Sequence, residues 1–189
     1  VDTDGPVLET PFEGSLTADI DYQNSATELI ISWSGSDSAS VIALYEYGLG
    51  VTPGGTQIVP WTSAGTATAD TLVFSSYQPL IEGVTYYLSV RATDVAGNMS
   101  APDTADGITI DLTAPAGSTV SDGTGADISY SGSDTTLSAN WVAFTETVSG
   151  VQKYEYAIGT TSGGTELVTW TDNDTTTSVT KTGLSLTSG

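Results

Sequence analysis

The sequence has 189 residues, of which 38% are hydrophobic, and its 23 acidic and 3 basic residues give a formal net charge of −20. Binding to nucleic acid or to an anionic membrane surface requires clustered Lys and Arg, so both are poor partners for this chain. No apolar stretch approaches the roughly 18 residues of a membrane-spanning helix, and we expect no membrane insertion. The acidic residues are scattered singly, which indicates either a solvated surface or binding of divalent cations.

Gly, Ser, Thr and Asp are abundant, whereas long runs of Ala, Leu, Glu and Lys are missing. This composition favours strands and turns over helices. There is no Cys, which is compatible with a cytosolic protein and with many bacterial surface proteins. The chain opens with Val-Asp-Thr-Asp, an unusual natural start, so we expect an internal piece of a longer protein.

Alternating apolar and polar residues predict about seven short strands in the first half of the chain, separated by turn-rich segments. In chain order they cover residues 6–12, 29–33, 42–49, 57–61, 69–75, 86–92 and 107–111. The strand at 86–92 has the clearest alternation, with Tyr86, Leu88, Val90 and Ala92 on one face. We therefore expect this strand at the centre of an all-β domain.

The sequence then repeats. Two blocks recur after 108 residues (126 − 18) and two after 109 residues (163 − 54), always in the same order. They are ADIDY at 18–22 with ADISY at 126–130, LIISW at 29–33 with LSANW at 137–141, YEY at 45–47 and 154–156, and GGTQIVPW at 54–61 with GGTELVTW at 163–170. The repeat predicts two tandem modules, residues 1–111 and 112–189, joined by a short segment that Pro115 stiffens.

These residues resemble fibronectin type III and related bacterial immunoglobulin-like repeats. Trp33 and Trp141 match the Trp that ends the family's second strand, and Leu80-x-x-Gly83-x-x-Tyr86 looks like its tyrosine corner. The resemblance implies tandem immunoglobulin-like, fibronectin type III-like β-sandwiches, with Trp33, Tyr86 and Trp141 as structural residues. It also implies that the Tyr86 hydroxyl hydrogen-bonds backbone a few residues upstream. A long insert at 13–22 departs from the family pattern.

The second module is expected to lack its last two strands. Leu186-x-x-Gly189 matches Leu80-x-x-Gly83 at a shift of 106 residues (186 − 80), so the chain ends where the second copy of strand 86–92 should begin. An incomplete sandwich exposes unpaired strand edges. The missing strands would come from a continuation of the chain, which we favour, or from a neighbouring identical subunit.

Catalysis is not expected. The sequence has no His and no Cys, so the commonest general base and the nucleophilic thiol are both missing. Asp19 and Asp21 lie on one face of a predicted strand, but Asp21 becomes Ser129 in the second copy. A carboxylate pair of the glycosidase type stays an open alternative.

Calcium is the best chemical hypothesis, because hard cations take oxygen ligands from carboxylates and Asn side chains. The predicted module joints and the turn after strand 86–92 concentrate such groups in Asp2, Asp4, Asp94, Asn98 and Asp111. The alternative is that Asp94 and Asn98 make ordinary turn hydrogen bonds. No other cofactor is expected.

Trp61 and Trp170 offer two interpretations. Exposed, they would stack on sugar rings, whereas their recurrence at one position of the repeat favours packing within each module. We predict a structural spacer, stalk or fibre-forming repeat of a secreted or cell-surface prokaryotic protein, whose partners are neighbouring modules or identical subunits. The alternative is an adhesin, or a carbohydrate-binding accessory module of a secreted enzyme.

Overall fold

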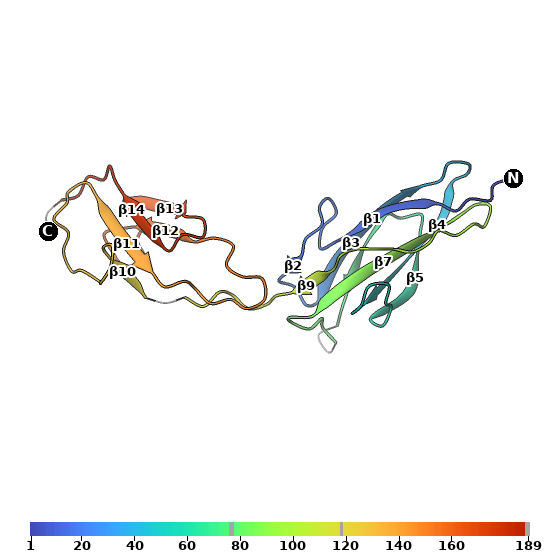
Figure 1. Ribbon diagram of the computed structural model, residues 1–189, viewed down its shortest axis with the longest axis horizontal. Helices are drawn as coiled ribbons and strands as arrows, with labels where there is room; N and C mark the ends of the chain where they lie inside the picture. Colours follow the sequence, from blue (N-terminus) through green and yellow to red (C-terminus); the bar gives the residue numbers. More distant parts are fainter. Residues whose placement is uncertain (76–77, 118, 188–189) are drawn as a thin grey trace. The chain divides into compact units, whose positions relative to one another are not determined.

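The computed structural model describes residues 1–75, 78–117 and 119–187. The chain divides into two compact units, unit 1 (Val1–Leu112) and unit 2 (Thr113–Gly189). The expected boundary, after Asp111, lies one residue before this division. All regular elements in the described ranges are β-strands, so the expected all-β class is confirmed (Figure 1). The described residues contain no helix with the length and apolar character needed to cross a membrane.

Unit 1 is a sandwich of two sheets. One sheet has the strand order β1-β3-β6, and the other has the order β2-β9-β7-β4-β5 with β8 beside β7. This arrangement is that of an immunoglobulin-like sandwich. The strands are β1 (Val7–Glu13), β2 (Tyr22–Gln23), β3 (Glu28–Ser36), β4 (Ile42–Gly50), β5 (Val59–Gly65), β6 (Ala69–Val73), β7 (Thr85–Asp94), β8 (Asp103–Thr104) and β9 (Ile108–Ile110).

The core of unit 1 lies between the two sheets, and β7 supplies its centre. The predicted inward residues of β7 are at most 2% exposed, and Trp33 on β3 is 5% exposed. Because β7 has neighbours on both edges, its backbone is paired along both sides as well. The other buried apolar residues of this core include Leu29, Ile31, Tyr45, Tyr47, Leu49, Leu72, Leu80, Ile108 and Ile110.

The tyrosine corner is present. The hydroxyl of Tyr86 accepts the backbone N–H of Ile81 at 2.9 Å. Between them Gly83 has a φ of 74°, a left-handed conformation that favours glycine. The N–H of Leu80 donates to the carbonyl of Ala26 at 2.7 Å, which fixes the segment before the corner to the edge of β3. Tyr86 therefore has the structural role that the resemblance implied.

The insert at residues 13–22 carries the chain from one sheet to the other. It begins at the end of β1 and ends in β2, which pairs with β9 in parallel, Tyr22 opposite Thr109. Gly14, with a φ of 80°, makes the turn out of β1. The sequence did not predict β2, because a strand of two residues has no readable alternation.

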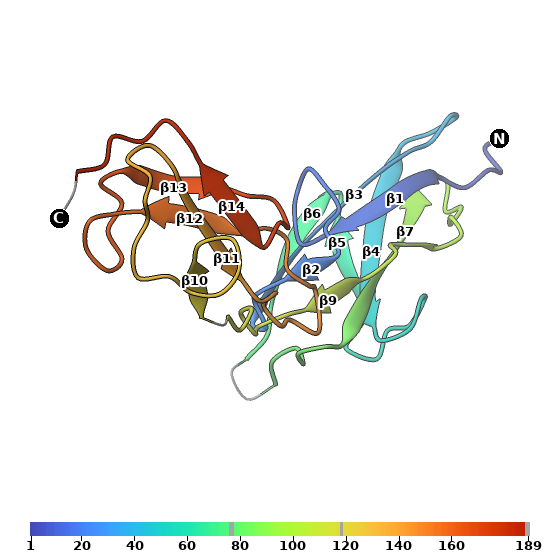
Figure 2. The same cartoon turned by 60° about the vertical axis from the view of Figure 1, so that its left-hand side comes forward.

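Unit 2 repeats five strands of unit 1, in sheets of order β10-β11-β14 and β12-β13 (Figure 2). The register also repeats: Ile158 pairs with Val168 as Leu49 pairs with Val59, and the same bulge precedes each pair. Among its described residues, unit 2 has no counterpart of β7 or β9, as expected. The strands are β10 (Val120–Asp122), β11 (Leu137–Trp141), β12 (Glu155–Ile158), β13 (Val168–Asp172) and β14 (Ser178–Lys181).

One expectation for unit 2 was wrong. The alternation of β11 predicts a core position for Trp141, but the residue is only half-buried. Its ring contacts Tyr154 at a centroid distance of 5.6 Å. In unit 1 the equivalent Trp33 packs against two tyrosines beneath a complete sheet. Sequence alternation gives the direction in which a side chain points, whereas burial depends on which strands cover it.

Candidate functional site

Three carboxylates meet at one end of unit 1. Asp2 precedes β1, Asp37 lies in the turn between β3 and β4, and Asp94 ends β7. One oxygen from each lies within 4.8 Å of the other two, a spacing that suits a shared cation. We refer to Asp2, Asp37 and Asp94 as the Asp triad.

Asp94 is held by the turn that follows β7. The backbone N–H and the side-chain amide of Asn98 each donate to the Asp94 carboxylate at 2.8 Å. Burial favours the neutral acid, but hydrogen bonds from Asn98, Gly97 and Ser40 outweigh it and lower the pKa of Asp94. The turn hydrogen bonds considered as an alternative to calcium are therefore present. They also favour the ionised form of Asp94, which is the form that binds a cation.

Asp37 is organised in the same way within its own turn. Its Oδ1 accepts the backbone N–H groups of Ala39 at 2.9 Å and Ser40 at 2.6 Å. These hydrogen bonds lower the pKa of Asp37. In the sequence, Asp37 belongs only to one of the turn-rich segments between predicted strands, here between strands 29–33 and 42–49. Nothing in one sequence places it beside Asp94, which is the last residue of β7.

Asp2 supplies the least satisfied oxygen of the Asp triad. Its Oδ1 accepts the N–H of Asp4 at 3.2 Å. Its Oδ2 is buried and has no hydrogen-bond partner among the described residues. A buried carboxylate oxygen without a donor is costly unless a cation balances it.

The five residues expected to bind calcium do not form one site. The carboxylates of Asp2 and Asp94 lie close together, and the side-chain amide of Asn98 donates a hydrogen bond to Asp94. Asp4 is outside the Asp triad. Asp111 follows β9, where its N–H donates to the carbonyl of Gln23 at 2.8 Å, so it belongs to the β2–β9 edge. Of the five residues, the structure brings Asp2 and Asp94 together, with Asp37 as the third carboxylate, and calcium binding stays a prediction.

A second acidic group surrounds Glu13, which ends β1 and is 0% exposed. Its Oε1 accepts the N–H of Leu88 at 2.5 Å, and its Oε2 accepts the N–H of Gly107 at 3.2 Å. Burial is the largest influence and raises the pKa of Glu13 to about 8; Asp19 and Asp106 add to the rise, whereas the two N–H groups oppose it. One oxygen each of Glu13, Asp19 and Asp106 lie within 4.8 Å of one another.

Part of the Glu13 arrangement recurs in unit 2. The sequence repeat already aligns Asp19 with Asp127 (127 − 19 = 108), and the structure adds that Asp122 takes the place of Glu13. Asp19 Oδ1 accepts the N–H of Glu13 at 3.0 Å, and Asp127 Oδ1 accepts the N–H of Asp122 at 2.9 Å. In each unit a glycine with positive φ follows the first acid. Burial raises the pKa of Asp19. The carboxylate of Asp19 therefore accepts a backbone hydrogen bond at the end of β1. This structural role differs from the glycosidase-like pairing with Asp21.

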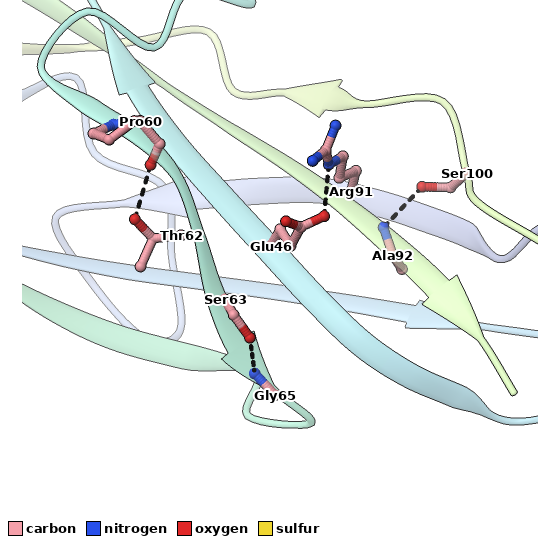
Figure 3. A network of polar contacts seen from close by, with 8 residues as sticks. All are labelled: Glu46, Pro60, Thr62, Ser63, Gly65, Arg91, Ala92 and Ser100. Atoms are coloured by element: carbon pink, nitrogen blue, oxygen red, sulfur yellow. Dashed lines mark hydrogen bonds and ion pairs between the residues drawn. The ribbon is translucent and has the colours of Figure 1, made fainter. Parts of the chain in front are cut away.

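On the outer face of the β5-β4-β7 sheet, the guanidinium group of Arg91 contacts an acidic and an aromatic side chain. Arg91 on β7 donates from Nε to Glu46 Oε2 on β4 at 2.8 Å (Figure 3). Its guanidinium also lies over the ring of Trp61, 4.4 Å from the centroid. Trp61 is half-buried, whereas Trp170, the equivalent residue of unit 2, is 66% exposed. The two tryptophans thus share a position in the repeat but not an environment.

Unit 1, with its two sheets and tyrosine corner, is an immunoglobulin-like β-sandwich. No family model matches the chain, and no curated protein matches it. Among solved structures the chain is similar to the FN1–FN3 domains of chicken CNTN1, at 16% identity and a TM-score of 0.36. The similarity covers 94% of this chain and 56% of that one. The fold assignment rests on the strand order and not on this match.

Proposed function

We propose that the chain is a non-catalytic structural segment, a spacer or stalk of tandem modules in a secreted or cell-surface prokaryotic protein. The proposal is supported by the kind of residue that recurs between unit 1 and unit 2. Residues repeated between the units occupy packing and turn positions. Tyr45 and Tyr154 contact the rings of Trp33 and Trp141, and Gly54 and Gly163 have φ values of 76° and 77°. The two units thus repeat the residues that form the fold and do not repeat a binding or catalytic site. This pattern suits a spacer that holds other domains at a distance and bears mechanical load.

Pulling on the two ends of the chain tests this role. Unit 1 should resist force and then unfold in one step, because β7 is paired on both edges and its residues fill the core. At roughly 3.5 Å per residue, the 112 residues of unit 1 extend to roughly 390 Å, so unfolding should lengthen the chain by that value less the length of the folded unit. Gradual extension of unit 1 without a step would contradict a load-bearing role.

We further propose that calcium binds the Asp triad and stiffens the end of unit 1. The orphaned Asp2 Oδ2 supports this, because Ca²⁺ would supply the partner that the described residues do not. It would also offset repulsion among three clustered carboxylates. Calcium would then tie the segment before β1 to the turns after β3 and β7.

Thermal melting with calcium and with chelator tests the site. Calcium at 100 times its Kd should stabilise unit 1 by about 2.7 kcal/mol, and Asp2→Asn should remove that increment. Asp111→Asn is the matched control and should keep it, because Asp111 lies outside the triad. If Asp19→Asn removes the increment and Asp2→Asn does not, calcium binds at the Glu13 group instead.

A carbohydrate-binding role is the second candidate, favoured by the exposed ring of Trp170. Sugar rings stack on such exposed aromatic faces. A glycan array probed with the whole chain and with Trp170→Ala would distinguish the candidates. Binding that disappears with Trp170→Ala would replace the spacer role with an adhesin or accessory-module role.

A further inference from the structure

The Glu13 group, which consists of Glu13, Asp19 and Asp106, gathers three acids in a part of the chain that is almost free of basic residues. One oxygen of each lies within 4.8 Å of the other two. The sequence of residues 1–112 contains a single basic side chain, Arg91, and its guanidinium is bound to Glu46 at 2.8 Å. Carboxylates this close repel one another, so protons or a bound cation must reduce their charge.

The contacts within the Glu13 group show that it uses a proton. The side chains of Asp19 and Asp106 are hydrogen-bonded to each other. An ionised carboxylate only accepts hydrogen bonds, so this bond exists only when one of the two acids carries a proton. The hydrogen-bonded form of the group therefore holds a proton between the insert and the segment before β9.

Glu13 joins three elements at this end of unit 1. β7 pairs with β9 near its start and with β8 near its middle. Between these two pairings the N–H of Leu88 donates to Glu13 Oε1, and the N–H of Gly107, in the segment from β8 to β9, donates to Oε2. Any change in the charge of Glu13 thus acts on β1, on β7 and on the entry to β9 together.

The insert that follows β1 is the part of unit 1 that can open most easily. Most of residues 14–22 are exposed, and Leu16 is 59% exposed. Ile20 packs against the core, and the N–H of Thr109 donates to the carbonyl of Asp21 at 2.8 Å. Segments with few buried apolar contacts open locally at a lower free energy than the whole domain.

The titratable groups on the elements packed around Glu13 are acids and tyrosines. On β3 the residue opposite Glu13 is Ile31, which carries no charge. The hydroxyl of Tyr86 is already bonded to backbone, and the ring of Tyr87 lies beside Gly107. The groups are Asp19 and Asp21 in the insert, Asp106 before β9, and Tyr86 and Tyr87 on β7.

We propose that the Glu13 group is a proton-operated latch: a proton held in the group keeps the insert closed on the segment before β9, and loss of the proton opens the insert while the core between the two sheets stays folded. Opening separates the three carboxylates and returns Glu13 to water. Unit 1 thereby carries a local pH response in addition to its structural role.

The direction of the response follows from Glu13. Burial, the largest cause, raises the pKa of Glu13 from 4.5 to about 8 in the closed form. The contribution of Glu13 to closure is therefore fully present below pH 4.5 and is lost as pH rises to about 8. The latch is closed in acid and opens in mildly alkaline solution.

Hydrogen exchange of the whole chain, followed by NMR with chelator present, tests the latch. The rates at each pH are divided by the intrinsic exchange rate at that pH to give protection. The amides of Gly107 and Thr109 should lose about tenfold or more of their protection between pH 5 and pH 8. The amides of the β4–β7 ladder should keep theirs. Equal losses in that ladder would overturn the latch, since the proton would then act on the whole domain.

Two substitutions locate the proton. Glu13→Gln should make the protection of Thr109 independent of pH between 5 and 8, whereas Glu9→Gln, the matched control on β1, should follow the wild type. Asp106→Asn should move the loss of protection to higher pH, because it removes one repelling charge. Unchanged protection in the β4–β7 ladder shows that each variant is folded. If Glu13→Gln loses protection at Thr109 as the wild type does, the proposal is overturned.

A bound cation is the alternative occupant of the Glu13 group, and calcium is the probe. The measurement uses Asp2→Asn, which lacks one acid of the Asp triad, at pH 8. Calcium should leave the Thr109 amide unprotected. If calcium instead restores its protection and chelator removes it again, a metal ion closes the insert and the proton latch is overturned.

Discussion

Replacing Glu13 by Gln should change how the stability of unit 1 depends on pH. Glu13 is buried, and its pKa is raised to about 8 from an ordinary value of 4.5. The folded state then binds more protons than the unfolded state between these two values. The contribution of Glu13 to the free energy of unfolding should therefore be fully present below pH 4.5 and should be lost as pH rises to about 8.

The magnitude follows from 1.36 kcal/mol per pKa unit: the loss across this window should be roughly 3–6 kcal/mol. Gln is neutral throughout and keeps a carbonyl oxygen for the N–H of Leu88. The variant should lack that part of the slope and should exceed the wild type in stability at pH 8. Glu9→Gln removes the same charge from an exposed position of β1, and it should follow the wild type.

Urea unfolding at several pH values measures this, with Trp141 and Trp170 replaced by Phe so that fluorescence reports unit 1. Other acidic groups contribute a slope that all variants share, so the difference between Glu13→Gln and Glu9→Gln isolates Glu13. If the two variants run parallel from pH 5 to 8, Glu13 does not titrate in this window. The Leu88 and Gly107 N–H groups would then stabilise its charged form more than burial opposes it.

Four further substitutions probe the scaffold in three comparisons, each measured by denaturant unfolding of unit 1. Tyr86→Phe should cost about 1–2 kcal/mol, because it leaves the Ile81 N–H without its hydroxyl partner; no loss would mean that water replaces the hydroxyl. Leu88→Ala should cost about 2–5 kcal/mol, because Leu88 is 0% exposed at the centre of the core; a cost below 1 kcal/mol would contradict its central place. Gly14→Ala should cost more than Gly54→Ala, since both have positive φ but only at Gly14 would a Cβ meet Ile20 at 2.4 Å and Ile108 at 2.7 Å; equal costs would show that backbone strain alone decides.

The polar groups that matter most here were the least visible in the sequence. Asp37 and Glu13 are unremarkable acids in a chain with 23 of them. Asp37 reaches Asp94 because two strand connections end at the same edge of the sandwich. Glu13 is buried where the end of β1 meets the N–H groups of Leu88 on β7 and Gly107 just before β9. Both effects depend on strand pairings between residues far apart in the chain.

The sequence by itself determined the all-β class, the repeat and the inward face of β7, because period-2 alternation and turn residues are local properties of the chain. It also determined the tyrosine corner, whose partners are five residues apart. Only the tertiary structure decided which acids meet, that Trp61 and Trp170 differ in exposure, and that Trp141 is half-open. These depend on which strands lie beside one another: Trp33 is core beneath β7, whereas the equivalent Trp141 is half-buried, because the described residues of unit 2 include no strand like β7 to cover it.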